Sequence, residues 1–227
     1  MKKYYITGTG TDIGKTFITS CINKLLINKY NKNIYAIKPV ISGFDKDNLP
    51  NDTSLILDSL NLKYDDSNID DISPFRLNLP LSPDMAAEKE NITLKYDDIL
   101  DFCNKTLERI KSQHKDYMFI EGVGGVMSPI CYGKTNLDLI ADLDISVILV
   151  CGSYLGSISH SLTAIKALEE NNITISSIVL SESEERDVDI DDVFKSLSNF
   201  TDYNIVVIRR DKEHKDMENI NIIEEIL

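Results

Sequence analysis

The sequence predicts an α/β fold built on a doubly wound, mainly parallel sheet with helices on both faces. The first observation is that short apolar runs rich in Ile, Val and Tyr alternate with longer amphipathic stretches, as in repeated strand–helix–strand units. The second is that these runs are almost continuously apolar, which is typical of strands buried on both faces of a parallel sheet. We expect strands over residues 3–7, 34–40, 117–122, 146–152, 175–181 and 204–208.

The stretches between these runs predict helices, because their apolar residues recur every three or four positions and so share one helix face. We expect the helices over residues 15–30, 94–110 and 158–171. The acidic, turn-rich stretches 45–52 and 65–74 are expected to be loops, and 184–192 to be the solvated start of a further helix. No linker, repeat or low-complexity tract divides the sequence, so we expect a single domain over residues 1–227.

The composition indicates a globular protein with no nucleic acid and no membrane as partner. Of its 227 residues, 42% are hydrophobic and 27% are charged, and the formal net charge is −13. This charge repels phosphate backbones and anionic lipids, and no run of Lys or Arg suggests a basic patch. There is no apolar run of about 18 residues, and the first apolar run is too short for a signal peptide, so we expect a cytoplasmic protein. The cysteines lack metal-ligand spacing and are expected to be reduced, small apolar residues: Cys21, Cys103, Cys131 and Cys151.

The stretch TGTGTDIGKT, from Thr7 to Thr16, follows the first expected strand and opens the first expected helix. Glycines let backbone N–H groups approach a ligand closely, and a helix start adds partial positive charge, so such a turn cradles phosphates. Lys15 would then reach the terminal phosphates, and the Thr16 hydroxyl would bind Mg²⁺. Gly8 and Gly14 enclose five residues instead of the usual four. We interpret the stretch as a variant P-loop, which makes the expected fold P-loop NTPase-like.

Further polar residues are expected at the same edge of the sheet. Glu121 ends the apolar run YMFIEG, where an acid of P-loop proteins holds the metal directly or through water. Lys38 ends the second run, and a second ammonium there would neutralise charge on a phosphoryl group in transit. Ser42 follows within reach of the same crevice, and Asp52 is a weaker metal candidate.

Six motifs in this order resemble the dethiobiotin synthetase family. They are TGTGTDIGKT (7–16), IKPVISG (37–43), ND (51–52), SPDMAA (82–87), EGVGG (121–125) and ILVCGSYLGSISH (148–160). The resemblance implies an ATP-dependent enzyme of biotin biosynthesis that converts 7,8-diaminopelargonate and CO₂ to dethiobiotin. One amine would take up CO₂ as a carbamate, ATP would convert the carbamate to a carbamic–phosphoric anhydride, and the second amine would close the ureido ring.

The resemblance also implies roles for individual residues. Lys15 and Lys38 would supply two cations, and Thr11 and Ser42 would touch the carbamate or phosphate. The Mg²⁺ ligands would be Thr16, Asp52 and Glu121. The nucleotide would lie against Asp12, Ile13, Gly14, Lys15, Thr16, Phe17, Asp52, Glu121, Gly122, Val123, Gly124 and Ser181. The distant carboxylate of the substrate would bind across a homodimer interface, at a helix start formed by Gly156, Ser157, Ile158 and Ser159.

The chain departs from the family pattern in the half that reads the base. Many relatives have Asn where this chain has Ser181, and an Ile-Pro turn where it has Ile208–Arg210. We therefore expect other nucleoside triphosphates to serve beside ATP. Asp84 stands where many relatives have His, and the sequence offers no physical reason for it.

A ParA/MinD-type switch ATPase is the alternative function. Such proteins carry an extra lysine early in the loop and a basic or amphipathic surface, and this sequence has neither feature. An amidoligase of cobalamin synthesis would need a glutaminase domain, for which the chain is too short after about residue 180. A non-catalytic nucleotide-binding module would have no need of Lys38, Ser42 and Asp52 together.

Overall fold

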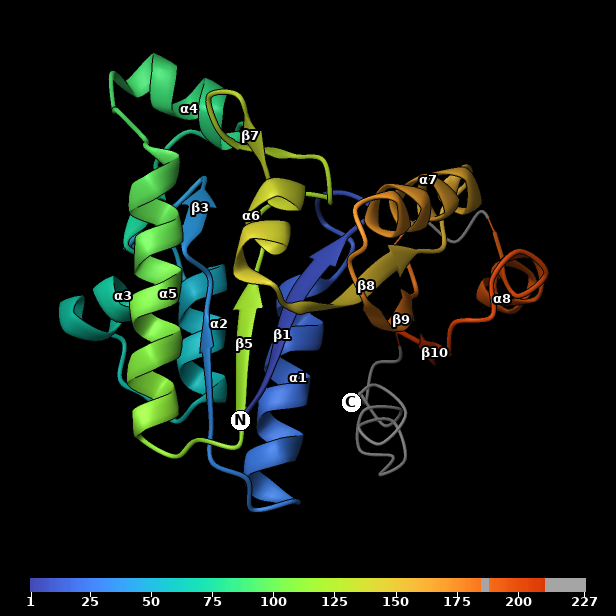
Figure 1. Ribbon diagram of the computed structural model, residues 1–227, viewed down its shortest axis with the longest axis horizontal. Helices are drawn as coiled ribbons and strands as arrows, with labels where there is room; N and C mark the ends of the chain where they lie inside the picture. Colours follow the sequence, from blue (N-terminus) through green and yellow to red (C-terminus); the bar gives the residue numbers. More distant parts are fainter. Residues whose placement is uncertain (185–187, 211–227) are drawn as a thin grey trace.

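Six parallel strands form the central sheet of the computed structural model, which describes residues 1–184 and 188–210 (Figure 1). Their order across the sheet is β10-β9-β8-β1-β5-β2. Each predicted apolar run contributes one strand: β1 (Lys2–Gly8), β2 (Ile34–Ile37), β5 (Tyr117–Glu121), β8 (Ser146–Gly152), β9 (Ile175–Ser181) and β10 (Ile205–Ile208). The central strands are buried on both faces, as their continuous apolar character predicts. The predicted α/β fold is confirmed.

The winding direction of the chain reverses at β1. The chain first runs from β1 to the edge strand β2, returns through β5, and then adds β8, β9 and β10 on the other side of β1. Right-handed crossovers therefore place α1 (Lys15–Asn28) on one face and α5 (Tyr96–Ser112), α6 (Asn136–Leu143) and α7 (Ser157–Glu170) on the other (Figure 1). Ligands of open α/β sheets bind beyond the carboxyl ends of the strands at such a reversal.

The three predicted helices are confirmed as α1, α5 and α7, with ends that differ by at most two residues. The loop predicted over 65–74 is wrong, because α3 (Asp66–Ile72) lies there. Ile69 and Ile72 are buried one turn apart, and the Asp65 side chain caps the helix by accepting the Asn68 N–H at 3.0 Å. The acids that suggested a loop instead favour the helix N-terminus.

Three further helices complete the described residues. The helix start expected over 184–192 is α8 (Ile190–Leu197), whose N-cap is Asp189, although residues 185–187 lie outside the described part. The sequence did not predict α2 (Asp52–Ser59) or α4 (Pro83–Glu90). Within the described residues, no helix is long and apolar enough to span a bilayer. The single domain over residues 1–227 stays a prediction.

The strand predicted over 34–40 is interrupted at Lys38 and Pro39. After β2 the chain enters β3 (Val40–Ser42), which pairs in parallel with β4 (Phe75–Leu77) outside the central sheet. Pro39 has no N–H for the ladder, so the sheet ends there and Lys38 is left at its carboxyl edge. A short antiparallel hairpin of β6 (Pro129–Cys131) and β7 (Lys134–Thr135) lies at the same end of the molecule (Figure 1).

Candidate active site

The predicted phosphate loop joins β1 to α1. Gly14 is the N-cap of α1 and has a φ of 92°, in the left-handed region that favours glycine. A Cβ at this position would also lie 2.9 Å from the Ser181 hydroxyl oxygen. The buried Ile13 side chain anchors the loop, whereas Thr11 and Asp12 are exposed at its rim. The N–H groups of the first turn of α1, which have no intrahelical partner, are thus available to an anion.

Two lysine ammonium groups are buried beside the loop. Lys15 donates to the Gly10 carbonyl at 2.6 Å, and burial followed by the Lys38 charge lowers its pKa to about 8. Lys38 pairs with Glu121 at 2.9 Å and also with Asp52. Burial would lower the pKa of Lys38, but the charges of Glu121 and Asp52 outweigh it and raise the pKa. Burial likewise opposes ionisation of Asp52, yet the Lys38 charge prevails and keeps its pKa below the usual range.

Glu121 is fully buried and receives donors on both of its oxygens. The Thr16 hydroxyl donates to Oε1 at 2.6 Å, and the Thr19 hydroxyl donates to Oε2 at 2.5 Å. The sequence reasoning missed Thr19, although its position three residues after Thr16 puts both hydroxyls on one face of α1. We infer that Thr19 orients the carboxylate.

The oxygens of Thr16, Asp52 and Glu121 converge on one cation, the Lys38 ammonium. Its Nζ lies 3.4 Å from Thr16 Oγ1 and bonds to both carboxylates. Hydroxyl and carboxylate oxygens are the ligands that Mg²⁺ takes in phosphate-binding sites. Since these oxygens already surround one cation, Thr16, Asp52 and Glu121 fit a Mg²⁺ ion whose remaining coordination positions the nucleotide would fill. No group of three or more His, Cys, Asp or Glu side chains within residues 1–184 and 188–210 is placed to hold a metal without such help.

The glycine stretch after β5 is held by Asn136, which the sequence reasoning did not single out. Its amide donates to the carbonyls of Val123 at 2.6 Å and Gly125 at 2.8 Å, and its oxygen accepts the Tyr5 hydroxyl at 2.7 Å. A Cβ on Gly122 would lie 2.8 Å from the Asn136 oxygen. The close approach explains the glycine, and it fixes the loop beside Glu121.

These elements surround one cavity of about 810 Å³. The predicted residues that line it are Thr11, Asp12, Gly14, Lys15, Thr16, Phe17, Lys38, Ser42, Asp52, Val123 and Gly124. Ile13, Glu121 and Gly122 are not on the lining; all three are buried. A further wall of this cavity, to which the sequence assigned no role, includes Ile41, Pro80, Leu81 and the first two residues of the SPDMAA motif, Ser82 and Pro83. Next to this wall, Ser82 donates to Asp84 at 2.6 Å in the first turn of α4, where a carboxylate is favoured by the helix dipole.

A second, smaller hollow of about 290 Å³ adjoins the loop on the side of β9 and β10. Its lining includes Gly14, Phe17 and the buried Ser181, together with Ile208 and Arg210. Phe17, which follows the P-loop Lys15 and Thr16, thus lies beside the ends of β9 and β10. The family resemblance predicts the base of the nucleotide at this place. Ser181 also lies beside the P-loop, and its contact with the base stays a prediction.

The predicted carboxylate-binding residues lie apart from both cavities. Gly156 caps α7 with a φ of 95°, and Ser157, Ile158 and Ser159 form its first turn. None of the four lines the cavity around Lys15 or the hollow around Ser181. Their role at the substrate carboxylate stays a prediction.

Comparison with known proteins decides the family. A family model described as an AAA domain matches residues 2–209. The ATP-dependent dethiobiotin synthetase BioD of Phenylobacterium zucineum is 42% identical over 81% of this chain and 77% of its own length. The chain belongs to the dethiobiotin synthetase family. The ATP-dependent dethiobiotin synthetase BioD of Caulobacter sp. strain K31 is 40% identical over 89% of this chain and 85% of its own length.

Solved structures with the same fold are more distant. The MinC:MinD cell division complex of Aquifex aeolicus gives a TM-score of 0.58 at 17% identity, covering 100% of this chain and 94% of that one. A ParA family ATPase from Chlorobium tepidum gives 0.53 at 15% identity, covering 99% and 92%. At such low identity, the likeness shows only that this member of the dethiobiotin synthetase family has the same P-loop fold as these proteins.

Proposed function

We propose that the chain is an ATP-dependent dethiobiotin synthetase, which joins CO₂ to 7,8-diaminopelargonate and closes the ureido ring. The observation that carries the proposal is the buried pair Lys15 and Lys38 beside the oxygens of Thr16, Asp52 and Glu121. A triphosphate, a divalent cation and a carbamate need compensating charges of both signs within one cavity. Phosphoryl transfer asks little covalent help from a protein, so positioning and charge supply most of the acceleration.

The residues of the cavity divide the work by charge. Lys15, at the start of α1, binds the terminal phosphates, and Lys38 stabilises the phosphoryl group as it moves to the carbamate oxygen. Thr11 and Ser42, which both line the cavity, donate to the carbamate or the phosphate. Thr16, Asp52 and Glu121 would hold Mg²⁺, which supplies neutralisation of the phosphate charge when bound.

The base hollow supports use of other nucleoside triphosphates beside ATP. Ser181 has one hydroxyl where a bidentate amide would distinguish adenine, so discrimination against CTP and GTP should be weak. Replacing it by the family residue tests this directly. We expect Ser181→Asn to raise the ratio of kcat/KM for ATP over CTP by about tenfold, and an unchanged ratio would contradict the role of Ser181.

The remaining proposals are a homodimer and a cytoplasmic location. Exposed apolar side chains near the start of α7 and on the β6–β7 hairpin support an interface, because Leu155 is 82% exposed and Tyr132 is 96% exposed. An interface at Leu155 would let Gly156–Ser159 reach the substrate of the second copy. All four cysteines are free thiols, as a reducing compartment requires. Sedimentation of Leu155→Asp as a monomer with a raised KM for the diamine would support the dimer.

A switch ATPase of the ParA/MinD type is not favoured, because its structural likeness to this chain is confined to the fold. The two functions differ in what triggers phosphate release. We expect release only when diaminopelargonate, bicarbonate, Mg²⁺ and ATP are all present, with the diamine converted to dethiobiotin. Release that continues without the diamine would favour the switch. The matched variants are Lys38→Met, expected to be inactive, and Lys105→Met, which removes an exposed lysine of α5 and should be fully active.

A further inference from the structure

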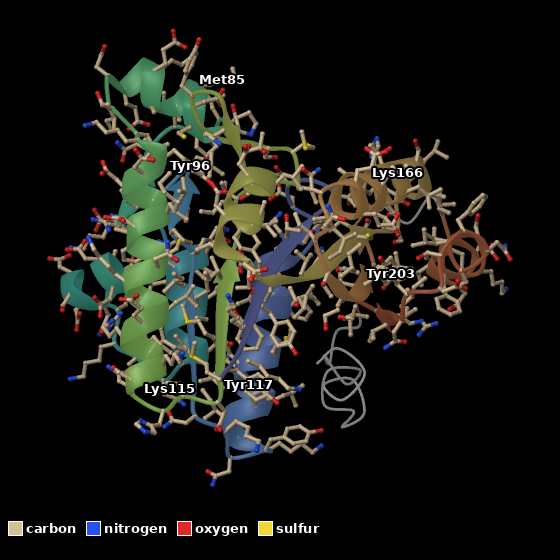
Figure 2. All side chains as sticks on the ribbon, viewed as in Figure 1. Met85, Tyr96, Lys115, Tyr117, Lys166 and Tyr203 are labelled. Carbon is tan, nitrogen blue, oxygen red and sulfur yellow. The ribbon has the colours of Figure 1, made fainter. Side chains whose placement is uncertain are left out.

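A basic hollow lies at the amino end of the central strands, the end opposite to the phosphate loop. Figure 2 shows Lys115 and Tyr117 at this end and Met85 of α4 at the other. The hollow encloses about 550 Å³ and is lined by four lysines together with His114, Asp116 and Tyr117. The four lysines come from three separate segments: Lys2, Lys32, Lys111 and Lys115. The sequence does not predict this cluster, because the three segments are far apart along the chain and only the fold brings them together.

Backbone and side-chain bonds tie the three segments into a fixed frame. The Asp116 N–H donates to the Asn33 carbonyl at 2.6 Å, and the Asp116 carboxylate accepts the Asn33 N–H at 2.8 Å. The Lys2 N–H donates to the Asp116 carbonyl at 2.8 Å, which fixes the start of β1 to the start of β5. The one carboxylate on the lining is thus engaged with backbone. The backbone around the hollow is therefore held in place before any ligand arrives.

Three of the four lysines, Lys32, Lys111 and Lys115, have no acidic partner within the described residues. Lys32 and Lys111 have no side-chain hydrogen bond or ion pair within the described residues, and Lys115 donates at 2.6 Å to the neutral amide of Asn33. Elsewhere in the described part of this strongly acidic chain, six lysines pair with carboxylates, whereas Lys63, Lys89 and Lys95 do not; the six are Lys24, Lys46, Lys105, Lys134, Lys166 and Lys195. A chain with 37 acids and 24 bases could easily place an acid here. The hollow is therefore a local region of positive potential on a negative protein.

We propose that this hollow binds a small anion that carries two or more phosphate groups, at a site separate from the catalytic cavity. Lysine ammonium groups bind phosphate as point charges, and several of them around one concavity favour a multivalent anion over a single charge. The ends of α1 and α5 nearby are carboxyl ends, whose partial negative charge also attracts lysines. The test must therefore distinguish a binding site from lysines that only neutralise these helix ends.

Inorganic pyrophosphate is a suitable probe, followed by NMR of the backbone amides of the full chain in magnesium-free buffer. Amides of residues 12–16 report the phosphate loop, and amides of 32–33 and 115–117 report the basic hollow. We expect the second set to shift along its own saturable curve. The two sets are read separately, so loss of the first alone would count against the nucleotide site and not against this proposal.

The double variant Lys32→Gln/Lys111→Gln should raise the dissociation constant from the hollow at least about tenfold, because two charges facing the anion are lost. The matched control Lys105→Gln/Lys166→Gln removes two charges on α5 and α7 and should leave that constant unchanged. If residues 32–33 and 115–117 do not shift at millimolar pyrophosphate, or if both double variants weaken binding equally, the lysines serve only the helix ends and the proposal is overturned.

Discussion

Replacing Lys38 by Met tests whether its buried charge holds the site together and also drives the chemistry. Met keeps most of the volume of the side chain but removes the ammonium that bonds to Glu121 at 2.9 Å and to Asp52. Glu121 is 0% exposed, so the variant leaves a carboxylate in the interior with only two hydroxyl donors, from Thr16 and Thr19. Breaking a buried ion pair in this way costs about 3–5 kcal/mol in the free energy of unfolding.

The magnitude translates into a measurable melting temperature. For a chain of this size, each kcal/mol lowers Tm by roughly 2–4 °C, so Lys38→Met should melt roughly 6–20 °C below the natural protein. The double variant Lys38→Met/Glu121→Gln removes both charges, and most of the lost stability should return, with a coupling of up to about 3 kcal/mol. Turnover should behave differently. It should fall about 10²–10³-fold in Lys38→Met and stay low in the double variant, because the ammonium that faces the phosphoryl group and a proposed ligand of Mg²⁺ are then both missing.

The assays are thermal or urea unfolding of the four proteins of the cycle, and release of phosphate with the complete substrate mixture. A Lys38→Met protein as stable as the natural one would mean that the pair with Glu121 contributes nothing to folding. Activity that returns together with stability in the double variant would show that Lys38 has only a structural role.

Three further predictions follow from the site and the core. Binding of a triphosphate should raise the pKa of Lys15 from about 8, so calorimetry in buffers of different ionisation enthalpy should detect uptake of about half a proton at pH 8. Net uptake should be smaller at pH 6, where Lys15 is already protonated and the terminal phosphate releases its own proton on binding; equal uptake at both would contradict this. Gly14→Ala should cost about 1–2 kcal/mol and weaken ATP binding, because of its φ of 92° and the Ser181 hydroxyl 2.9 Å from the new Cβ. Gly10→Ala, which meets nothing within 4 Å, is the control for this variant, and equal effects would refute the steric argument. Burial raises the pKa of Cys103 and Cys151 to about 12, so neither thiol should react with iodoacetamide at pH 8 until the protein unfolds, and rapid labelling of native protein, read by mass spectrometry, would contradict their burial.

The sequence predicts the sheet well because parallel strands buried on both faces carry a strong local signal. Strands β5 and β8 are almost wholly apolar, β1 carries the apolar run Tyr4 to Ile6, and the predicted bounds of all three agree with the structure within a residue or two. The phosphate loop is predictable for a similar reason, since glycine, lysine and threonine must be adjacent in sequence to open one helix. Glu121 and Lys38 follow from their positions at strand ends, which a parallel sheet brings to one edge.

What the sequence does not predict depends on contacts between distant segments or on weak local signals. The short helix α3 was missed because its first residues are acidic, and only Ile69 and Ile72 show its buried face. Asn136 contributes by hydrogen bonds to carbonyls 11 and 13 residues earlier, which no local pattern reveals. The wall from Pro80 to Pro83 and the basic hollow around Lys111 are likewise assembled by topology.

The most direct measurement is a crystal structure of the protein with diaminopelargonate, Mg²⁺ and a non-hydrolysable ATP analogue. We predict that the terminal phosphate lies at the opening of α1, that Lys15 leaves the Gly10 carbonyl and donates to this phosphate, and that Lys38 faces the same phosphate. A nucleotide bound elsewhere, with Lys15 still on that carbonyl and Lys38 still enclosed by the two acids, would contradict it.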